Sequence, residues 1–173
     1  KVFQALTGAY IEVLRGTPIL LQLYFFWLLL PKVLPFKVSD TACIIVALVI
    51  NSSSYVAEVI RAGIQAVDKG QMEAAKSLGL SNKNAMRYVI LPQAVKNILP
   101  AIANEFVVII KESAITYTIG VQDIMGAVNN IRGATFLIME PLLVATALYF
   151  CLCFPTSKII AYFERRMSRG DRR

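Results

Sequence analysis

The chain has 173 residues, of which 57% are hydrophobic and 17% are charged, and its mean hydropathy is +0.60. Ordinary globular domains carry about 45–50% apolar and about 25% charged residues, so this composition indicates a membrane protein. The absence of histidine excludes a His-based catalytic triad and a His-ligated metal, and no G-x-x-x-x-G-K-[ST] motif offers a loop for ATP phosphates.

Three uncharged stretches mark the expected membrane spans in chain order. They are Gly16–Pro31, Thr41–Ala57 and Pro141–Ser157. Each comes close to the ~17–25 residues that a helix needs to cross the hydrocarbon core. A soluble chain of this length could hardly bury three such helices, so we expect all three to span a membrane.

The first span is expected to begin within the sequence Arg15-Gly16-Thr17-Pro18. Thr17 can cap the helix, and Pro18 at the first helical position loses an N–H that would be unpaired anyway. Arg15 would then lie at the level of the lipid headgroups.

The second span becomes polar in its second half. Asn51, Ser54, Tyr55 and Glu58 recur at helical spacing, so they share one helical face with Arg61. Lipid offers polar groups no partners, so this face must meet protein or a water-filled cavity. For Asn51 and Ser54 two interpretations stay open, namely helix–helix contact and the lining of a substrate path. For the charged Glu58 we favour the lining of a path or a local pair with Arg61.

Residues 66–95 are rich in polar and charged residues, and they contain sequence patterns that mark the ends of short helices. The capping-box pattern Asp68-x-x-Gln71 predicts a short helix that ends at Gly79, which can adopt the left-handed conformation. Ser81 can cap a second short helix, which is expected to end before Pro92 because the residue before proline resists helical geometry. The sequence thus predicts a compact pair of short helices between two spans.

A fourth, weaker span is expected at Lys96–Thr116, which carries several charges. The basic Arg61–Lys96 connection and the Lys158–Arg173 tail are both expected on the cytoplasmic side, and the last span crosses once between them. A further crossing must therefore lie before Pro141, and its charges must face the bundle interior or the outer interface. The fold class is then all-α, a polytopic transmembrane bundle with about four spans in a single domain over residues 1–173.

The basic residues of the chain support this topology. Among the 18 Lys and Arg residues, only Lys32, Lys37, Lys111 and Arg132 fall on the outer face. An excess of Lys and Arg marks the cytoplasmic side of a membrane protein. The net charge of +7 is therefore interpreted as an orientation signal and not as a sign of nucleic-acid binding.

A short amphipathic helix is expected on the outer face before the last span. Val121, Ile124, Val128 and Ile131 recur at helical spacing beside polar residues. Glu140-Pro141 then begins the last span.

One segment resembles a known motif. Glu73-Ala74-Ala75, Gly79 and Val89-Ile90-Leu91-Pro92 resemble the EAA motif (EAA-x3-G-x9-I-x-LP) of the permeases of binding-protein-dependent importers. The only departure is Val89, a conservative replacement for isoleucine. The motif falls within the connection that the topology places in the cytoplasm.

Other stretches are similar to the polar amino acid branch of that family, which includes histidine, glutamine and arginine permeases. They are Tyr10–Pro18, Asn51–Gly63, Lys111–Ser113 and Phe163–Arg166. The resemblance covers nearly the whole chain. Such permeases have one more helix before the Arg-Gly-Thr-Pro segment, where this sequence has only Lys1–Leu14, so we expect that helix to be missing before residue 1.

The resemblance implies the permease subunit of a type I ABC importer for polar or charged amino acids, with its C-terminus in the cytoplasm of a bacterium. The residues expected to dock on an ATPase subunit dimer are Glu73, Ala74, Ala75, Gly79, Leu91 and Pro92. ATP and Mg²⁺ would bind that partner, and this chain would bind no cofactor and catalyse no reaction. The other expected partners are an extracytoplasmic solute-binding protein, membrane lipid and a second permease subunit, identical or different, with no nucleic acid.

The candidates for the substrate path share polarity at membrane depth. They are Asn51, Ser54, Tyr55, Glu58, Glu105, Lys111 and Glu112. Two rival interpretations remain. Glu58, Glu105 and Glu112 could be the acid–base groups of a membrane-embedded enzyme, although no nucleophile–base pair or metal-ligand set accompanies them. The chain could also be a channel-like or structural subunit without ATP-driven transport, which would need no docking segment.

Overall fold

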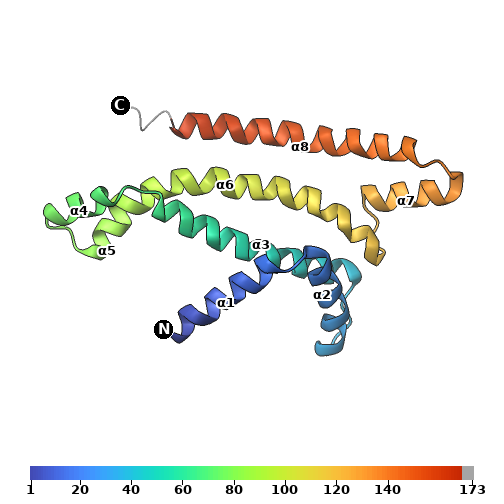
Figure 1. The fold of residues 1–173 in the computed structure, drawn as a ribbon, viewed down its shortest axis with the longest axis horizontal. Helices are drawn as coiled ribbons and strands as arrows, with labels where there is room; N and C mark the ends of the chain where they lie inside the picture. Colours follow the sequence, from blue (N-terminus) through green and yellow to red (C-terminus); the bar gives the residue numbers. More distant parts are fainter. Residues whose placement is uncertain (169–173) are drawn as a thin grey trace.

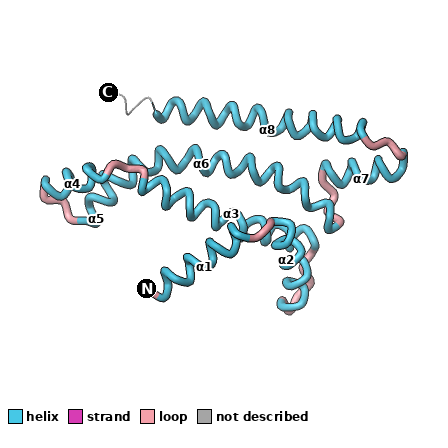
Figure 2. The backbone as a smooth tube through the Cα atoms, in the orientation of Figure 1, coloured by secondary structure: helices cyan, strands magenta, loops and turns pink. Residues whose placement is uncertain are grey.

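The computed structural model describes residues 1–168, and all of their regular structure is helical (Figures 1 and 2). The elements are α1 (Val2–Gly16), α2 (Ile19–Val33), α3 (Asp40–Gln65), α4 (Lys69–Ser77), α5 (Asn82–Ala85), the π-helix η1 (Met86–Ile90), α6 (Leu91–Glu112), the 3₁₀-helix η2 (Ser113–Ile119), α7 (Ile124–Thr135) and α8 (Met139–Ser168). The predicted all-α fold is confirmed. Arg169, Arg172 and Arg173, which belong to the predicted basic tail, lie outside the described residues.

Helices α3, α6 and α8 run side by side and alternate in direction, with α6 packed between the other two (Figure 1). Helices α4 and α5 lie at one end of this bundle, together with the C-terminal end of α8. Helix α7 lies at the opposite end (Figure 1). This arrangement agrees with the predicted placement of the basic connection and the tail on one side and of the short amphipathic helix on the other.

Two helices, α3 and α8, are long and apolar enough to cross a membrane, as predicted for the second and last spans. The first predicted span, Gly16–Pro31, falls largely on α2, which is short for a crossing. Helix α2 has 15 residues, which cover about 22 Å at ~1.5 Å per residue, less than the ~30 Å hydrocarbon core. Helices α1 and α2 meet the requirement only together, as a pair bent by 111°.

Helix α6 takes the place of the predicted fourth span. Its 22 residues cover about 33 Å, enough for a bilayer core. It is nevertheless not among the helices that are apolar enough to be recognised as spans, because it carries charged residues such as Glu105 and Lys111. Its position between α3 and α8 shields part of its surface from lipid, so the crossing by α6 stays a prediction.

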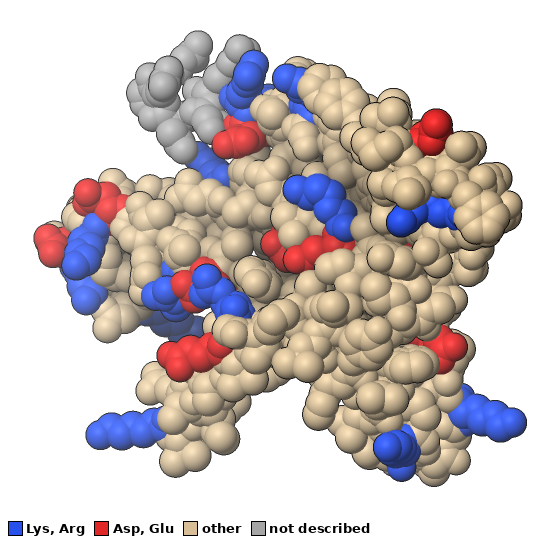
Figure 3. Space-filling model, turned by 45° about the vertical axis from the view of Figure 1, so that its right-hand side comes forward, with Lys and Arg blue, Asp and Glu red and all other residues tan. Residues whose placement is uncertain are grey.

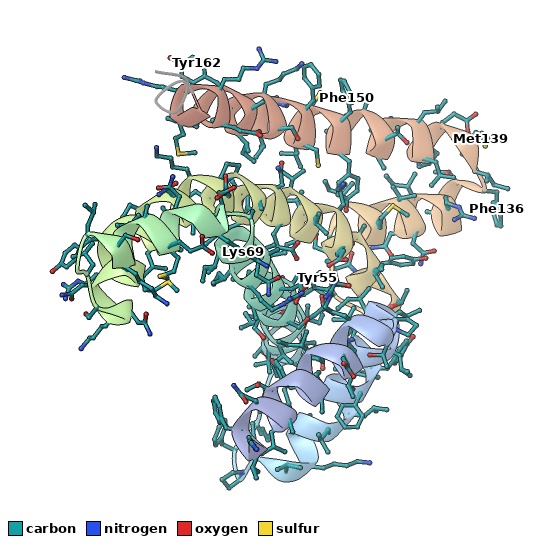
Figure 4. The ribbon with its side chains drawn as sticks, turned by 60° about the vertical axis from the view of Figure 1, so that its left-hand side comes forward. Tyr55, Lys69, Phe136, Met139, Phe150 and Tyr162 are labelled. Carbon is teal, nitrogen blue, oxygen red and sulfur yellow. The ribbon has the colours of Figure 1, made fainter. Side chains whose placement is uncertain are left out.

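The buried core is small and lies where α2, α3 and η2 meet. Leu23, Ile44, Ala47 and Ile119 form it. Helix α8, by contrast, leaves most large apolar side chains uncovered, and Phe150 and Tyr162 project away from the bundle (Figure 4). In water this exposure would be costly, whereas a lipid environment or a neighbouring subunit removes the cost.

The junction between α1 and α2 differs from the prediction. Thr17 does not cap α2, because its hydroxyl donates to Val13 O at 2.8 Å and so belongs to the end of α1. Pro18 is the residue before α2, which begins at Ile19 without a side-chain cap.

Candidate functional site

The end of α4 is a Schellman motif built on Gly79. Leu80 N donates to Ala75 O at 3.1 Å, and Gly79 N donates to Lys76 O at 2.9 Å. Gly79 has φ +83°, in the left-handed region that a Cβ atom disfavours. The predicted turn is therefore confirmed, and it redirects the chain within a few residues.

Both predicted N-caps are present in this segment, which we call the knob (residues 68–92). Asp68 Oδ1 accepts from Gly70 N at 2.7 Å and caps α4. Ser81 Oγ accepts from Asn84 N at 3.4 Å and caps α5. The capping box is only half formed, because the Gln71 side chain accepts from Gln93 instead of bonding back to Asp68.

The side chains of the EAA sequence face two ways. Ala75 is buried against the other short helices of the knob, whereas Glu73 and Ala74 are exposed. Leu78, on the turn before Gly79, is 84% exposed. Leu78 follows Ala74 by four residues, so these two exposed side chains lie on the same face of α4.

The knob passes into α6 without the predicted break at Pro92. Residues Met86–Ile90 form a π-helix, in which Leu91 N donates to Met86 O, five residues back. In a regular α-helix the ring of Pro92 would clash with the carbonyl of Tyr88. The wider π-turn accommodates this ring, so the helix continues and the predicted end before Pro92 is wrong. Leu91 and Pro92 both lie exposed at the start of α6.

A side-chain clasp joins the knob to the bundle. Gln93 Nε2 donates to Val89 O at 2.9 Å and to Gln71 Oε1 at 3.2 Å, so it links α4 with the start of α6. A cavity of about 450 Å³ between the end of α3 and the knob has Met72 and Met86 in its lining. The knob is thus attached to α6 by both the main chain and a side chain.

The polar half of α3 divides into two groups. Asn51 and Ser54 are both buried. Asn51 Nδ2 donates to Gln22 Oε1 on α2 at 2.9 Å, and Ser54 Oγ donates to Asn51 O within α3 at 2.7 Å. For Asn51 the contact joins two helices, which is one of the two interpretations that the sequence left open.

Tyr55 and Glu58 form the second group, where α3 meets α1 (Figure 4). The guanidinium of Arg15 lies 5.6 Å from the centre of the Tyr55 ring and 3.7 Å from Glu58 Oε1. Glu58 also accepts from both Nε and Nη2 of Arg61. The local Glu58–Arg61 pair is therefore present, and Arg15 extends it to a second helix.

Glu105 and the last turn of α6 lie apart from these groups. Ser52 Oγ donates to Glu105 Oε1 at 3.5 Å, which places this half-buried carboxylate beside the middle of α3. Lys111 is exposed and Glu112 is half-buried at the end of α6 that leads to α7. Figure 3 shows a small group of acidic and basic side chains near the centre of one face, with the other charged side chains mainly toward its edges.

Several residues of this polar region were not predicted. Gln22 is buried within the stretch that was expected to form the first span, and it was not among the predicted polar residues. Tyr10 Oη lies 2.6 Å from Ser53 Oγ and donates to Ile50 O at 3.3 Å, which joins α1 to α3. A glutamine isolated among apolar residues, four positions after a proline, was the available signal for Gln22.

Comparison with known proteins identifies the family. Residues 1–169 match the family described as the inner membrane component of binding-protein-dependent transport systems. The chain belongs to this family.

Individual members and a solved structure agree with this result. The permease is 43% identical over 162 residues to the arginine transport system permease protein ArtQ of Bacillus subtilis (strain 168), a match that covers 94% of this chain and 74% of that protein. A crystal structure described as an amino acid ABC transporter with histidines is 50% identical, with a TM-score of 0.83 over 92% of this chain and 74% of that chain. The family and the apolar helices together identify this permease as a multi-pass membrane protein.

Proposed function

We propose that the chain is the permease subunit of an ABC importer that moves polar or charged amino acids across the bacterial cytoplasmic membrane. ATP hydrolysis would take place on a separate ATPase subunit. One observation carries the proposal: a chain that is similar to an arginine permease over 94% of its length presents the EAA motif on an exposed, capped knob.

The shape of the knob supports a coupling role. Glu73 and Ala74 are the exposed residues of the motif that would dock in a cleft of the ATPase, and Ala75 packs inward to hold the helices together. Force can pass through such an element only if it moves as a rigid body. The Schellman turn at Gly79 and the Gln93 clasp provide this rigidity. The π-turn joins the knob directly to α6, whose first residues are Leu91 and Pro92.

The charges of the bundle support an amino acid as cargo. A zwitterion in a region of low dielectric needs partners for both ends, because leaving one end unpaired costs several kcal/mol. Glu105 would pair with an ammonium or a basic side chain, and Tyr55 would add a hydroxyl group. Glu58 already pairs with Arg15 and Arg61, and Asn51 already donates to Gln22, so these two side chains would border the path. Lys111 and Glu112 lie near the end of the bundle that would face outwards. Ser54 is fully buried, so it would stabilise the polar half of α3 without contacting the substrate.

The rest of the assembly follows from the same proposal. The knob would face the cytoplasm and meet an ATPase dimer that holds ATP and Mg²⁺, while a solute-binding protein would deliver the amino acid to the α7 end. A second permease subunit and lipid would cover the exposed apolar face of α8. The chain itself would bind no cofactor.

Uptake by proteoliposomes tests the proposal. The full complex, with its ATPase and solute-binding protein, is reconstituted with ATP inside, and radiolabelled amino acids are offered one at a time. We expect ATP-dependent uptake of one or a few polar amino acids. A complex lacking the solute-binding protein is the matched control and should show little uptake.

Two results would contradict the proposal. Uptake that proceeds without ATP would indicate the channel-like alternative. Failure of the tagged permease to recover a P-loop ATPase from detergent-solubilised membranes would also rule out the coupled transporter.

A further inference from the structure

The Gln22 side chain replaces a hydrogen-bond donor that the backbone lacks. In a continuous α-helix the carbonyl of Leu14 would accept from the amide of Pro18, four residues later, but proline has no N–H. Gln22 Nε2 donates to Leu14 O at 2.8 Å instead. The same nitrogen donates to Thr17 O at 3.1 Å and to Thr17 Oγ1 at 2.8 Å. The Gln22 amide therefore provides a hydrogen-bond donor to backbone carbonyls at the C-terminal end of α1.

The other atom of the same amide connects this corner to α3. Gln22 Oε1 accepts from Asn51 Nδ2 at 2.9 Å. Gln22 is only 5% exposed and Asn51 only 3%. Buried amides need all of these partners, because an unsatisfied polar group in the interior is costly. The Gln22 side chain thus joins α1, α2 and α3, and the hydrogen-bond donors of its amide group are all used.

The corner decides where α1 lies. The chain bends by 111° between α1 and α2, and from this corner α1 extends along α3. It places Tyr10 on Ser53 and Arg15 beside Tyr55 and Glu58. A change in the angle between α1 and α2 would move Tyr10 and Arg15 away from the polar half of α3.

We propose that Gln22 is a positioning residue for transport: its buried amide fixes the angle between α1 and α2 and thereby holds Arg15 over the polar half of α3. This inference rests on the proposed function for its effect on uptake. Its structural part concerns the angle alone and is measured separately.

Distances between spin labels test the angle. Cysteines replace Gln4 on α1 and Val33 on α2, both exposed, in a background without native thiols. The complete complex is assembled with a large excess of unlabelled permease, so that label pairs within one chain dominate the signal. We expect one narrow distance distribution for the parent and a broad one for Gln22→Met, which keeps the length of the side chain but removes its donor and acceptor.

Two further variants distinguish the role of the donor atom Nε2 from that of the acceptor atom Oε1. Gln22→Glu keeps an acceptor for Asn51 but loses the donor to Leu14, so it should broaden the distribution as Gln22→Met does. Asn51→Leu removes only the bond to Oε1 and should leave the distribution narrow. In uptake assays we expect Gln22→Met to lower the maximal rate about tenfold while KM changes by less than about twofold, the size expected for a buried carbonyl left without its donor.

Narrow distributions in both Gln22 variants would overturn the proposal, whatever the uptake rate. A broad distribution with a parental maximal rate would also overturn it, because the angle would then not matter for transport. If neither Gln22 variant assembles although Asn51→Leu does, Gln22 is a folding residue and the proposal is wrong. Absence of uptake by the parent complex would contradict the proposed function alone, since the distances are read independently.

Discussion

The Nη1 atom of Arg15 lies 3.7 Å from Oε1 of Glu58, and this contact ties the end of α1 to the second half of α3. Glu58 also binds Arg61 one helical turn further on. Its carboxylate therefore already has two cationic partners. Glu105 is half-buried and accepts a hydrogen bond from the Ser52 hydroxyl. Its carboxylate therefore has more capacity than that of Glu58 to accept hydrogen bonds from a cationic substrate.

The first prediction follows from this difference. Glu105→Gln should raise the KM for a basic amino acid by about tenfold, because a charge-assisted hydrogen bond is worth about 1.5–3 kcal/mol. Uptake kinetics for basic and neutral amino acids measure the effect. Glu58→Gln is the matched control and should act mainly on the maximal rate. If Glu105→Gln keeps the parental affinity and substrate range, the binding site lies elsewhere.

The second prediction concerns the turn at Gly79. A Cβ atom added at Gly79 would meet nothing within 4 Å, so the cost of a substitution is conformational and amounts to about 1–2 kcal/mol for most residues. Gly79→Val should leave the subunit in the membrane but lower ATP-dependent uptake. Gly79→Asn is the control, because asparagine tolerates the left-handed region. Normal uptake by Gly79→Val would contradict the role of this turn in coupling.

The third prediction separates the fold of the knob from its docking. Ala75→Leu should destabilise the knob by about 1–3 kcal/mol, because the site is buried and closely packed. Ala74→Leu changes an exposed position and should leave thermal stability unchanged while weakening recovery of the ATPase in a pull-down. Equal recovery of the ATPase by Ala74→Leu and the parent would remove this residue from the docking surface.

The fourth prediction concerns orientation. Single cysteines at Ser81 and Asn130, both exposed and at opposite ends of the bundle, are introduced after replacement of Cys43, Cys151 and Cys153. With an impermeant maleimide on intact cells, Asn130→Cys should react, and Ser81→Cys should react only after permeabilisation. The reverse pattern would place the knob outside, where it could not meet an ATPase.

Features that depend on local sequence were predicted well. Helices α3 and α8 follow from their uncharged stretches, and α7 follows from its apolar spacing. The turn at Gly79 and the cap at Ser81 were predictable because each depends on a few neighbouring residues and on one conformational preference.

Features that depend on contacts between distant residues were missed. Nothing in Gln22 itself indicates that its partners are Leu14 and Asn51, which only the fold brings together. The prediction of Thr17 as a helix cap failed because its hydroxyl is used by the preceding helix. For the substrate path the sequence identified polar residues of the right kind, but it could not show that Asn51 is committed to another helix.

The π-helix at Met86–Ile90 also sets the direction in which the knob faces. A π-turn holds about one more residue than an α-turn, and each residue of an α-helix advances the chain by about 100° around the axis. If the same residues wound as a regular α-helix, α4 and α5 would be rotated by about that angle relative to α6. The surface of Glu73 and Leu78 would then face a different direction without any change in its own residues. The winding of this short segment therefore determines the direction in which the docking surface faces.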